Sequence, residues 1–561
     1  MYNEEYVKYL NTLHNVGAKN ENTIAEASQN SEFFKDILVE RPTTNFIVKS
    51  LTENEPHIIL ITGHAGDGKT SLLIQVLQEL NAVVGNLKAS DLVRLPSGKE
   101  CLYIKDFSEY SANDRKDMLG KCLKQSMQGK YVILVANTGP LLNTFADILG
   151  NDAQMQLIDA IDTNTGEIKD IENYKIRAIN IASIDNSSFV KPFLQKLIAE
   201  KCFENCNECP KKNICPILFN RNLIFDSQEK VFDFLHNHFI WQQEHGRRLT
   251  IRQIIAQITF ALTAGLECKS VKSNTNKRYL FEYLFSNSIF GYKGVRLNKQ
   301  ANQIQAVYDI NANGYDNKSL ISDEKIFILE DYYSLHPRLQ EIIKEIKSQY
   351  SNNSLIEWQK AVRRMYILFN IETDSKINEE TLKCIFSRKF SRYLDLRNGR
   401  IPNNDDKVLI MEAFSILFVG HANKNSREIS ITMKRENSVE QSVQMLYGNI
   451  ATRDIKLKTL NKNSCNFGEE ENKELHIEVF NQTINHPISL SLLNYFEDIR
   501  SGIISTNIDP QLTHGIDSIK AQILSMCKPN AEKGAVEMIV MGTKEWTTIS
   551  LQEENNNWIL N

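Results

Sequence analysis

The pattern with the clearest chemistry lies between residues 63 and 70. It reads Gly-His-Ala-Gly-Asp-Gly-Lys-Thr and fits G-x-x-x-x-G-K-[ST] at every position. Glycines let such a loop wrap around phosphates with its N–H groups pointing inward, and the N-terminus of a following helix favours the anion. We expect Lys69 to reach the β- and γ-phosphates of ATP and Thr70 to bind Mg²⁺. The predicted nucleotide-binding residues are Gly63, His64, Ala65, Gly66, Asp67, Gly68, Lys69, Thr70 and Ser71.

Phosphoryl transfer also requires a carboxylate near the magnesium ion. Asp106 and Asn137 each follow an apolar run, a pattern typical of P-loop ATPases that insert a strand between the phosphate loop and the magnesium-binding acid. We predict that Asp106 binds Mg²⁺, that Asn137 orients the attacking water or senses the γ-phosphate, and that Glu109 polarises the water. With Lys69 these are the predicted catalytic residues. The alternative is that Asp106 caps a turn, and Phe107 stands where a glutamate is more usual.

Arginines often complete such sites by stabilising charge on the transferring phosphoryl group. Arg248 and Arg252 flank the start of one predicted helix, and Arg363 and Arg364 lie on another. Each is a candidate sensor or arginine finger. For each, a solvated or ion-paired surface arginine is the favoured alternative.

Four cysteines form a second pattern, Cys202-x3-Cys206-x2-Cys209-x5-Cys215. Thiols at such short loop spacing can converge on one ion, and a structural Zn²⁺ held by all four is the first interpretation. An iron–sulfur cluster and four unligated cysteines are the alternatives. The first three cysteines also match the C-x3-C-x2-C spacing of radical-SAM enzymes, but the upstream phosphate loop argues against that chemistry.

Basic and aromatic residues alternate between positions 387 and 400, which read SRKFSRYLDLRNGR. Basic residues beside aromatic ones can hold phosphates and stack bases. A solvated basic helix face is favoured over nucleic-acid contact.

The residues of the phosphate loop and the two strand-end residues, Asp106 and Asn137, must be positioned by the strands and helices around them. Apolar runs predict strands, and Ser71–Leu80 has helical periodicity directly after the phosphate loop. The predicted strands are His57–Thr62, Cys101–Lys105, Tyr131–Ala136 and Ile176–Ile184. Strands that alternate with helices predict an α/β fold, here a P-loop NTPase core with a parallel sheet of the inserted-strand (ASCE) type. Because the motif has this context, a chance glycine turn is disfavoured.

Five segments follow from changes in pattern along the chain. Thr250 and Gln253 form a predicted capping box at the start of a helix that ends near Gly265. Alternating residues at 429–433 and 475–480 predict strands, and 487–500 predicts a helix. The segments are an N-terminal helical lead (1–50), the P-loop NTPase domain (51–190), the cysteine-cluster module (191–225), a helical domain (226–420) and a C-terminal mixed α+β domain (421–561).

Composition excludes several classes of protein. The chain has 561 residues, of which 42% are hydrophobic, and its net charge is −4. These values exclude a wholly disordered chain, a collagen and a coiled-coil rod, and they leave no global basic field for DNA. The N-terminus lacks the pattern of a secretory signal, and the longest apolar stretch, 408–420, is shorter than the ~18 residues that span a bilayer. We therefore expect a cytoplasmic protein without membrane contact.

The motif set resembles the DptF-like ATPase subunits of bacterial phosphorothioation-dependent (Dnd/Dpt) restriction systems, or a sister ATPase of another antiphage system. The matching pieces are GDGKT at 66–70, DFSE at 106–109 and ANTG at 136–139. The resemblance implies that Glu109 is a functional acid. It also implies a small subunit and a helicase-like subunit as partners, which act together on invading DNA that lacks the host modification.

The leading functional hypothesis is an ATP-binding and ATP-hydrolysing subunit of a bacterial restriction complex. No PD-(D/E)xK nuclease pattern stands out, so cleavage would belong to a partner, and DNA contact would be direct or through partners. Two alternatives are a STAND-like signalling NTPase that oligomerises on sensing a phage trigger and a nucleotide-binding scaffold with little hydrolysis. The sequence leaves a homo-oligomer open.

Overall fold

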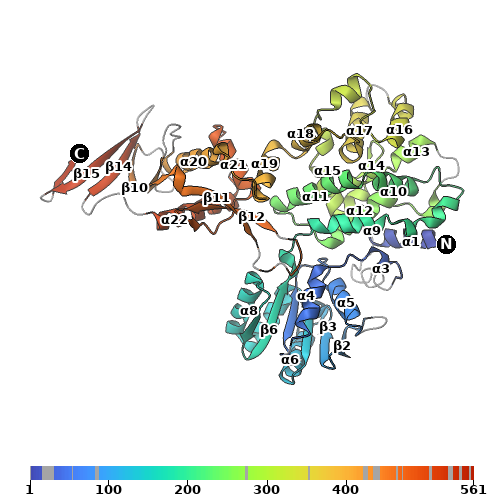
Figure 1. Ribbon diagram of the computed structural model, residues 1–561, viewed down its shortest axis with the longest axis horizontal. Helices are drawn as coiled ribbons and strands as arrows, with labels where there is room; N and C mark the ends of the chain where they lie inside the picture. The colour runs from blue at the N-terminus through green and yellow to red at the C-terminus, as the bar shows by residue number, and fades with distance from the viewer. Residues whose placement is uncertain are drawn as a thin grey trace. The chain divides into compact units, whose positions relative to one another are not determined.

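The computed structural model divides the chain into two compact units. The first comprises Met1–Phe386 and Asn463–Asn472, and the second comprises Ser387–Lys462 and Lys473–Asn561 (Figure 1). The residues that the structure describes are 2–14, 31–53, 55–82, 87–271, 276–350, 354–420, 428–433, 442–462, 465, 467–470, 472–503, 508–527, 535–541, 546–554 and 557–560.

The predicted helical lead, 1–50, is described in part, because residues 15–30 lie outside the described residues. Its described part is helical, as predicted. The helices are α1 (Tyr2–Thr12), α3 (Phe34–Ile37) and α4 (Pro42–Ser50).

A six-stranded sheet organises the segment after α4. Its strands are β1 (Ile58–Thr62), β2 (Ser90–Arg94), β3 (Glu100–Ile104), β4 (Tyr131–Ala136), β5 (Ile168–Ile171) and β6 (Tyr174–Asn180). The spatial order is β2-β3-β4-β1-β6-β5. Strands β3, β4, β1 and β6 are parallel, whereas the edge strands β2 and β5 are antiparallel to their neighbours. The predicted α/β class is confirmed, with a mixed sheet in which β4 lies between β1 and β3.

The two edge strands escaped the sequence analysis because their side chains are mostly half-exposed or exposed and make no apolar run. Strand β1, by contrast, is buried along its whole length. Its residues alternate between two cores, with Ile59 and Ile61 on one face of the sheet and Ile58 and Leu60 on the other. This burial on both faces explains why the strand reads as a continuous apolar run.

Helices cover both faces of the sheet. Residues of α4 and of α5 (Lys69–Glu79) pack in the core that contains Ile59. Residues of α6 (Ala112–Met127), α7 (Thr138–Leu149) and α8 (Asn151–Thr163) pack in the core that contains Ile58. The helix predicted at 71–80 is thus confirmed as α5, and it begins within the phosphate-loop motif.

The rest of the first unit is mainly helical. Its helices are α9 (Val190–Leu197), α10 (Pro216–Asp226), α11 (Gln228–Glu244), α12 (Ile251–Thr263), α13 (Lys277–Glu282), α14 (Phe285–Ile289), α15 (Gln305–Ala312), α16 (Pro337–Lys347), α17 (Leu355–Phe369) and α18 (Ser375–Ile385), with a short hairpin of β7 (Tyr292–Lys293) and β8 (Arg296–Leu297). The predicted capping box at Thr250 and Gln253 is confirmed at the start of α12. The helix ends at Thr263, and the next residue, Ala264, takes the left-handed conformation one residue before Gly265.

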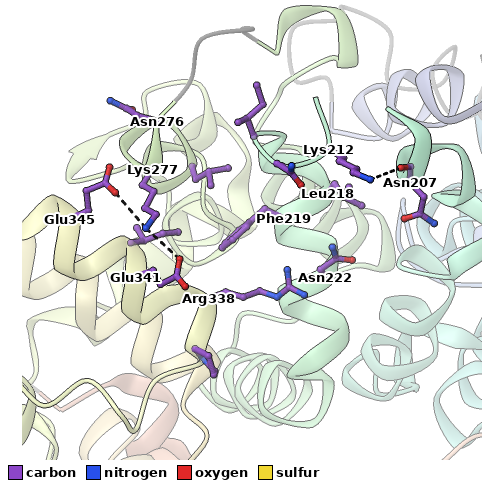
Figure 2. A pocket seen from close by; sticks show the side chains of 15 residues that line it. Asn207, Lys212, Leu218, Phe219, Asn222, Asn276, Lys277, Arg338, Glu341 and Glu345 are labelled. Carbon is purple, nitrogen blue, oxygen red and sulfur yellow. Dashed lines mark hydrogen bonds and ion pairs between the residues drawn. The ribbon is translucent and has the colours of Figure 1, made fainter. Parts of the chain in front are cut away.

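A cavity of about 730 Å³ lies among these helices (Figure 2). One wall comes from residues that follow the second and third cysteines of the cluster, including Asn207 and Lys212, and another comes from α13 and α16. In the latter wall, Lys277 of α13 forms ion pairs with Glu341 at 3.3 Å and Glu345 at 3.5 Å, both of α16. None of the predicted nucleotide-binding residues lines this cavity.

A short segment, 463–472, joins the first unit although its neighbours in sequence belong to the second. Phe467 is buried in the same core as Ile59 and packs edge-on against Phe46, with ring centroids 5.0 Å apart. Glu469 accepts hydrogen bonds from Arg41 Nε at 3.0 Å and from the Thr43 hydroxyl at 2.6 Å. The C-terminal domain was predicted as one contiguous segment, 421–561. The structure interrupts it, because residues 463–472 belong to the first unit.

The second unit combines helices with two antiparallel sheets. The elements are α19 (Arg388–Arg397), α20 (Asn404–Val419), β9 (Glu428–Met433), β10 (Val443–Ala451), β11 (Ile455–Asn461), β12 (Lys473–Val479), β13 (Gln482–Thr483), α21 (Leu490–Arg500), α22 (Pro510–Met526), β14 (Ala535–Met541), β15 (Trp546–Glu554) and β16 (Asn557–Leu560). The sheet orders are β16-β15-β14-β10-β9 and β11-β12-β13. The strands predicted near 429 and 475 and the helix predicted near 487 appear as β9, β12 and α21.

The boundary predicted after residue 420 falls inside the second unit. Helix α20 packs against α21 and β9, and α19 packs against α21 and β12, so both helices belong with the strands that follow them. The apolar stretch 408–420 forms most of α20. No helix in the described part of the chain is long and apolar enough to cross a membrane.

Candidate functional site

The phosphate-loop motif connects β1 to α5 at the edge of the sheet where the parallel strands end. Gly66 and Gly68 have φ values of 89° and 83°, which glycine adopts without strain. A Cβ on Gly63 would stand 2.8 Å from Ile181 Cγ1, and a Cβ on Gly66 would stand 3.0 Å from Thr250 Oγ1. Among the described residues, no side chain caps the N-terminus of α5. Such an uncapped helix N-terminus can accept an anion.

The other loop residues differ in exposure. His64 and Ala65 are exposed at the tip, Asp67 is buried, and Thr70 and Ser71 are half-buried on the first turn of α5. The tip is therefore open to solvent, while the part next to α5 is enclosed.

Lys69 points its ammonium group back into the loop. Its Nζ donates hydrogen bonds to the carbonyl oxygens of Gly63 at 3.1 Å and His64 at 2.7 Å, and to Asn137 Oδ1 at 2.8 Å. All three acceptors are neutral. Because none of them cancels the charge of the ammonium, the group remains suited to an anionic ligand.

Burial lowers the pKa of Lys69 to about 8. The nearby carboxylates of Asp67 and Asp106 oppose this decrease, and Arg252 adds to it. The lysine is thus a buried cation whose charged form a bound triphosphate would stabilise.

Thr70 and Asp106 are in direct contact. The Thr70 hydroxyl donates to Asp106 Oδ1 at 2.8 Å. Asp106 adopts a left-handed conformation with φ 52°, which is uncommon for a residue other than glycine and costs about 1–3 kcal/mol. The next residue, Phe107, is fully buried and anchors the turn. A hydroxyl beside a carboxylate supplies the hard oxygen ligands that Mg²⁺ prefers.

Asn137 follows β4 and begins α7, so it stands between the ends of β1 and β3. Its backbone N–H donates to Ser108 Oγ at 2.6 Å, and its side-chain oxygen accepts from Lys69. Glu109 ends the 3-10 turn η1 (Phe107–Glu109), and its side chain is exposed. The structure therefore brings Lys69, Thr70, Asp106 and Asn137 together, while the side chain of Glu109 is exposed.

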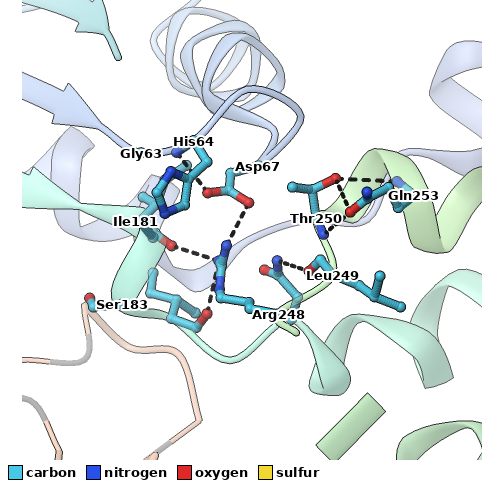
Figure 3. Close-up of polar contacts among 12 residues, drawn as sticks. Gly63, His64, Asp67, Ile181, Ser183, Arg248, Leu249, Thr250 and Gln253 are labelled. Carbon is cyan, nitrogen blue, oxygen red and sulfur yellow. Dashed lines mark hydrogen bonds and ion pairs between the residues drawn. The ribbon is translucent and has the colours of Figure 1, made fainter. Parts of the chain in front are cut away.

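The sequence analysis missed the role of Asp67 as an ion-pair partner inside the loop (Figure 3). Its carboxylate accepts from the His64 N–H at 2.9 Å and from Arg248 Nη1 at 2.9 Å. Arg248 also donates to the carbonyl oxygens of Ile181 and Ile184 at 3.3 and 3.2 Å. A buried carboxylate requires a nearby positive charge. The aspartate within the loop motif was therefore the feature of the sequence that could have indicated a cationic partner.

The start of α12 contacts the opposite side of the loop. The Arg252 N–H donates to the Gly66 carbonyl oxygen at 3.0 Å, and Thr250 lies against Gly66. The loop is thus joined directly to the helical part of the first unit.

The other two candidate arginines, Arg363 and Arg364, form ion pairs with aspartates in the helical part of the first unit. Arg363 pairs with Asp323 at 2.8 Å, and the fully buried Arg364 pairs with Asp316 at 2.5 Å. Their side chains hold the helical part together.

The four predicted metal-binding cysteines occupy a segment of short turns between α9 and α10. Cys202 is buried, whereas Cys206, Cys209 and Cys215 are half-buried. Within the described residues, no group of three or more His, Cys, Asp or Glu side chains is arranged so that it could hold a metal ion.

The basic segment contains α19, and three of its cations, Lys389, Arg392 and Arg400, are ion-paired within the second unit. Arg392 contacts Asp405, Asp406 and Glu497 at 3.1, 2.7 and 3.1 Å, and Lys389 contacts Asp498 at 2.5 Å. The favoured interpretation was a solvated basic face, and in the structure carboxylates pair with Lys389 and Arg392 on this helix.

No family model, curated protein or solved structure matches the chain. The functional argument therefore depends on the residues of the loop and their geometry.

Proposed function

We propose that this chain binds ATP with Mg²⁺ and hydrolyses it, as a subunit of a bacterial DNA restriction or antiphage complex. The observation that carries the nucleotide part is the meeting of Lys69, Thr70, Asp106 and Asn137 at one edge of the sheet, with contacts of 2.8 Å between Thr70 and Asp106 and between Lys69 and Asn137. These residues come from three neighbouring strand ends of the order β3-β4-β1. That order supports an inserted-strand P-loop core.

Each residue has a role that its surroundings support. Lys69 exchanges its neutral acceptors for the β- and γ-phosphates, and the N-terminus of α5 receives phosphate oxygens. The Thr70 hydroxyl and the Asp106 carboxylate would hold Mg²⁺, which neutralises phosphate charge when bound. Asn137 is within reach of the Lys69 ammonium, so its amide would lie near the terminal phosphate and orient the attacking water.

Glu109 is the candidate for polarising water, and its position also supports a second function. Phe107 directly after Asp106 is buried, and Glu109 lies on an exposed turn two residues further on. The place directly after Asp106, where a glutamate is more usual, therefore lacks an acid. A nucleotide-binding scaffold with little hydrolysis is therefore the second candidate.

Two contacts suggest how the loop would affect the rest of the chain. The α12 N-terminus contacts Gly66, and Arg41 donates to the Asp67 carbonyl oxygen at 3.4 Å while it pairs with Glu469. Since residues 463–472 connect β11 to β12, nucleotide binding could reach both the helical part and the second unit. This is the behaviour expected of an ATP-driven switch.

The assignment to a restriction complex depends on the resemblance of the short motifs to DptF-like subunits. The partners it implies are a small subunit and a helicase-like subunit, with DNA contacted by the chain or through them. A structural metal, Zn²⁺ or an iron–sulfur cluster, is a further part of the proposal.

Calorimetry with ATP and Mg²⁺ together with steady-state hydrolysis tests the nucleotide part. We expect Lys69→Ala to weaken binding by about 10–150-fold, because it removes a charge-assisted hydrogen bond worth about 1.5–3 kcal/mol, and to abolish turnover. Equal turnover by the two proteins would remove the ATPase proposal. Binding without turnover in the native chain, even with DNA and partners present, would favour the scaffold.

A further inference from the structure

The short turn after β3 carries a serine that the proposed function does not use. The turn η1 is closed by the Glu109 N–H, which donates to the Asp106 carbonyl oxygen at 2.9 Å. Ser108 lies at the centre of this turn and is half-buried, between the fully buried Phe107 and the exposed Glu109. The turn packs against β4, α6 and α7. Ser108 is therefore close to the end of the next parallel strand.

The Ser108 hydroxyl joins this turn to the end of β4. Its oxygen accepts a hydrogen bond of 2.6 Å from the backbone N–H of Asn137, the residue that follows β4 and precedes α7. Because a serine side chain is short, its oxygen stays close to the main chain of the turn. The contact therefore fixes the main chain of Asn137 relative to Asp106, which stands two residues before Ser108.

Asn137 is used in an unusual way for an asparagine that precedes a helix. An asparagine at this position commonly accepts a hydrogen bond from a backbone N–H in the first turn of its own helix. In the described structure Asn137 makes no such cap to α7, and its Oδ1 accepts from the Lys69 ammonium at 2.8 Å. Pro140 occupies the third position of the helix and has no N–H to donate. The side chain of Asn137 is thus turned to the phosphate loop while Ser108 holds its main chain.

These two contacts of Asn137 respond differently to a nucleotide. In the proposed function the Lys69 ammonium leaves its neutral acceptors for the β- and γ-phosphates, so the Asn137 side chain loses that partner when ATP binds. The contact with Ser108 involves only the backbone N–H of Asn137 and requires no such exchange. It remains as a link between Asn137 and the turn after Asp106 when the phosphates are in place.

We propose that Ser108 is a positioning residue for ATP hydrolysis, and that its hydroxyl holds Asn137 at a set distance from the magnesium-binding Asp106. The inference rests on the proposed function, which gives Asn137 the task of orienting the attacking water. In this role Ser108 acts through the backbone of Asn137 and needs no contact with ATP. A small displacement of a group that orients water slows the reaction without weakening the binding of the nucleotide.

Steady-state kinetics and calorimetry with a non-hydrolysable ATP analogue separate positioning from binding. We expect Ser108→Ala to lower kcat for ATP by about 5–100-fold, because the Asn137 N–H loses its acceptor. The dissociation constant of the analogue should change by less than about twofold. Ser108→Thr keeps the acceptor oxygen and should recover most of kcat. An unchanged kcat in Ser108→Ala, or an equal decrease in Ser108→Thr, would overturn the proposal.

Ser111 offers a matched control in the same loop. Its side chain is exposed and caps α6 by accepting from the Asp114 N–H at 3.3 Å. Ser111→Ala should lower the midpoint of thermal unfolding, because a helix loses its cap, and should leave kcat at the native value. If Ser111→Ala lowers kcat as much as Ser108→Ala does, general destabilisation explains both effects and the proposal is wrong.

Hydrogen exchange at single-residue resolution makes the test independent of turnover. The Asn137 N–H should exchange slowly in the native chain, with and without ATP and Mg²⁺, and faster in Ser108→Ala. Equal exchange rates in the two proteins would overturn the link between Ser108 and Asn137. Failure of the proposed function looks different, since the native chain would show no turnover while the difference in exchange persists. The role of Ser108 in hydrolysis would then fall, and its contact with Asn137 would stand.

Discussion

Lys69 in the phosphate loop and Arg392 in α19 are both cations that the sequence offered as candidates to hold phosphate. Arg392 meets three carboxylates, whereas Lys69 hydrogen-bonds only to neutral oxygens in the contacts described above. A cation whose charge is matched locally has little reason to bind another anion. A buried cation held by neutral acceptors remains attractive to one. Clustering of basic residues is thus a weaker guide to a phosphate site than the charges of their partners.

Among variants that leave Lys69 in place, the largest effect should follow from Asp106→Asn, which removes the carboxylate partner of Thr70. We expect kcat for ATP to fall by about 10²–10³-fold, because the magnesium ion loses a charged ligand and phosphate charge is less well neutralised. Hydrolysis rates over a range of Mg²⁺ concentrations measure this. Asp498→Asn, the partner of Lys389 at α19, is the matched control and should leave kcat unchanged. An equal decrease of kcat in Asp106→Asn and Asp498→Asn would show that the phosphate loop and α19 do not differ in this respect.

A smaller effect is expected at the ion pair inside the loop. Arg248→Ala leaves the Asp67 carboxylate buried and unpaired, so it would repel phosphate, and ATP affinity should fall by about 10–100-fold. The double variant Asp67→Asn/Arg248→Ala should recover part of that loss, because the repelling charge is gone. Calorimetry of the single and double variants gives the coupling between the two residues. An affinity unaffected by Arg248→Ala would show that the pair has no part in binding.

At α19 the expected effect is on stability. Arg392→Met leaves Asp406, which is 1% exposed, with Arg400 as its remaining ion-pair partner among the described residues, and should destabilise the second unit by about 1–3 kcal/mol. ATP affinity should not change. Lys389→Ala removes a more exposed pair and should alter stability by less than about 1 kcal/mol. Denaturant unfolding measures the stability of both variants.

A different outcome would make α19 a nucleic-acid surface. In that case the variants would lose DNA affinity without destabilisation, and the slope of log affinity against log salt concentration would decrease by about one.

The smallest effect concerns pH. Nucleotide binding should require protonated Lys69, whose pKa of about 8 in the free protein would rise beside a triphosphate. Affinity should therefore be level just below pH 8 and fall by up to about tenfold per pH unit above it, until the raised pKa of the complex is reached. Calorimetry between about pH 7.5 and 9.5 tests this sign. Lys69→Arg, which keeps its charge throughout that range, should show no such fall. A native affinity that is constant above pH 8 would contradict the role of the ammonium.

Much of the α/β part of the first unit could be predicted from sequence, because the patterns that indicate its elements each span only a few neighbouring residues. The phosphate loop, β1 and α5 lie within one contiguous stretch, and each depends on glycine geometry or on apolar periodicity over a few residues. An aspartate and an asparagine at strand ends predicted an inserted strand, and in the structure β4 lies between β1 and β3. The edge strands β2 and β5 gave no such signal because they are not buried on both faces.

Contacts between residues far apart in the sequence were decided only by the tertiary structure. Arg248 meets Asp67, and Glu469 meets Arg41. Local sequence determines which backbone conformations and which buried faces are favourable. The partner of a buried charge is chosen by how whole helices and turns pack, and that choice depends on all the elements between the two residues.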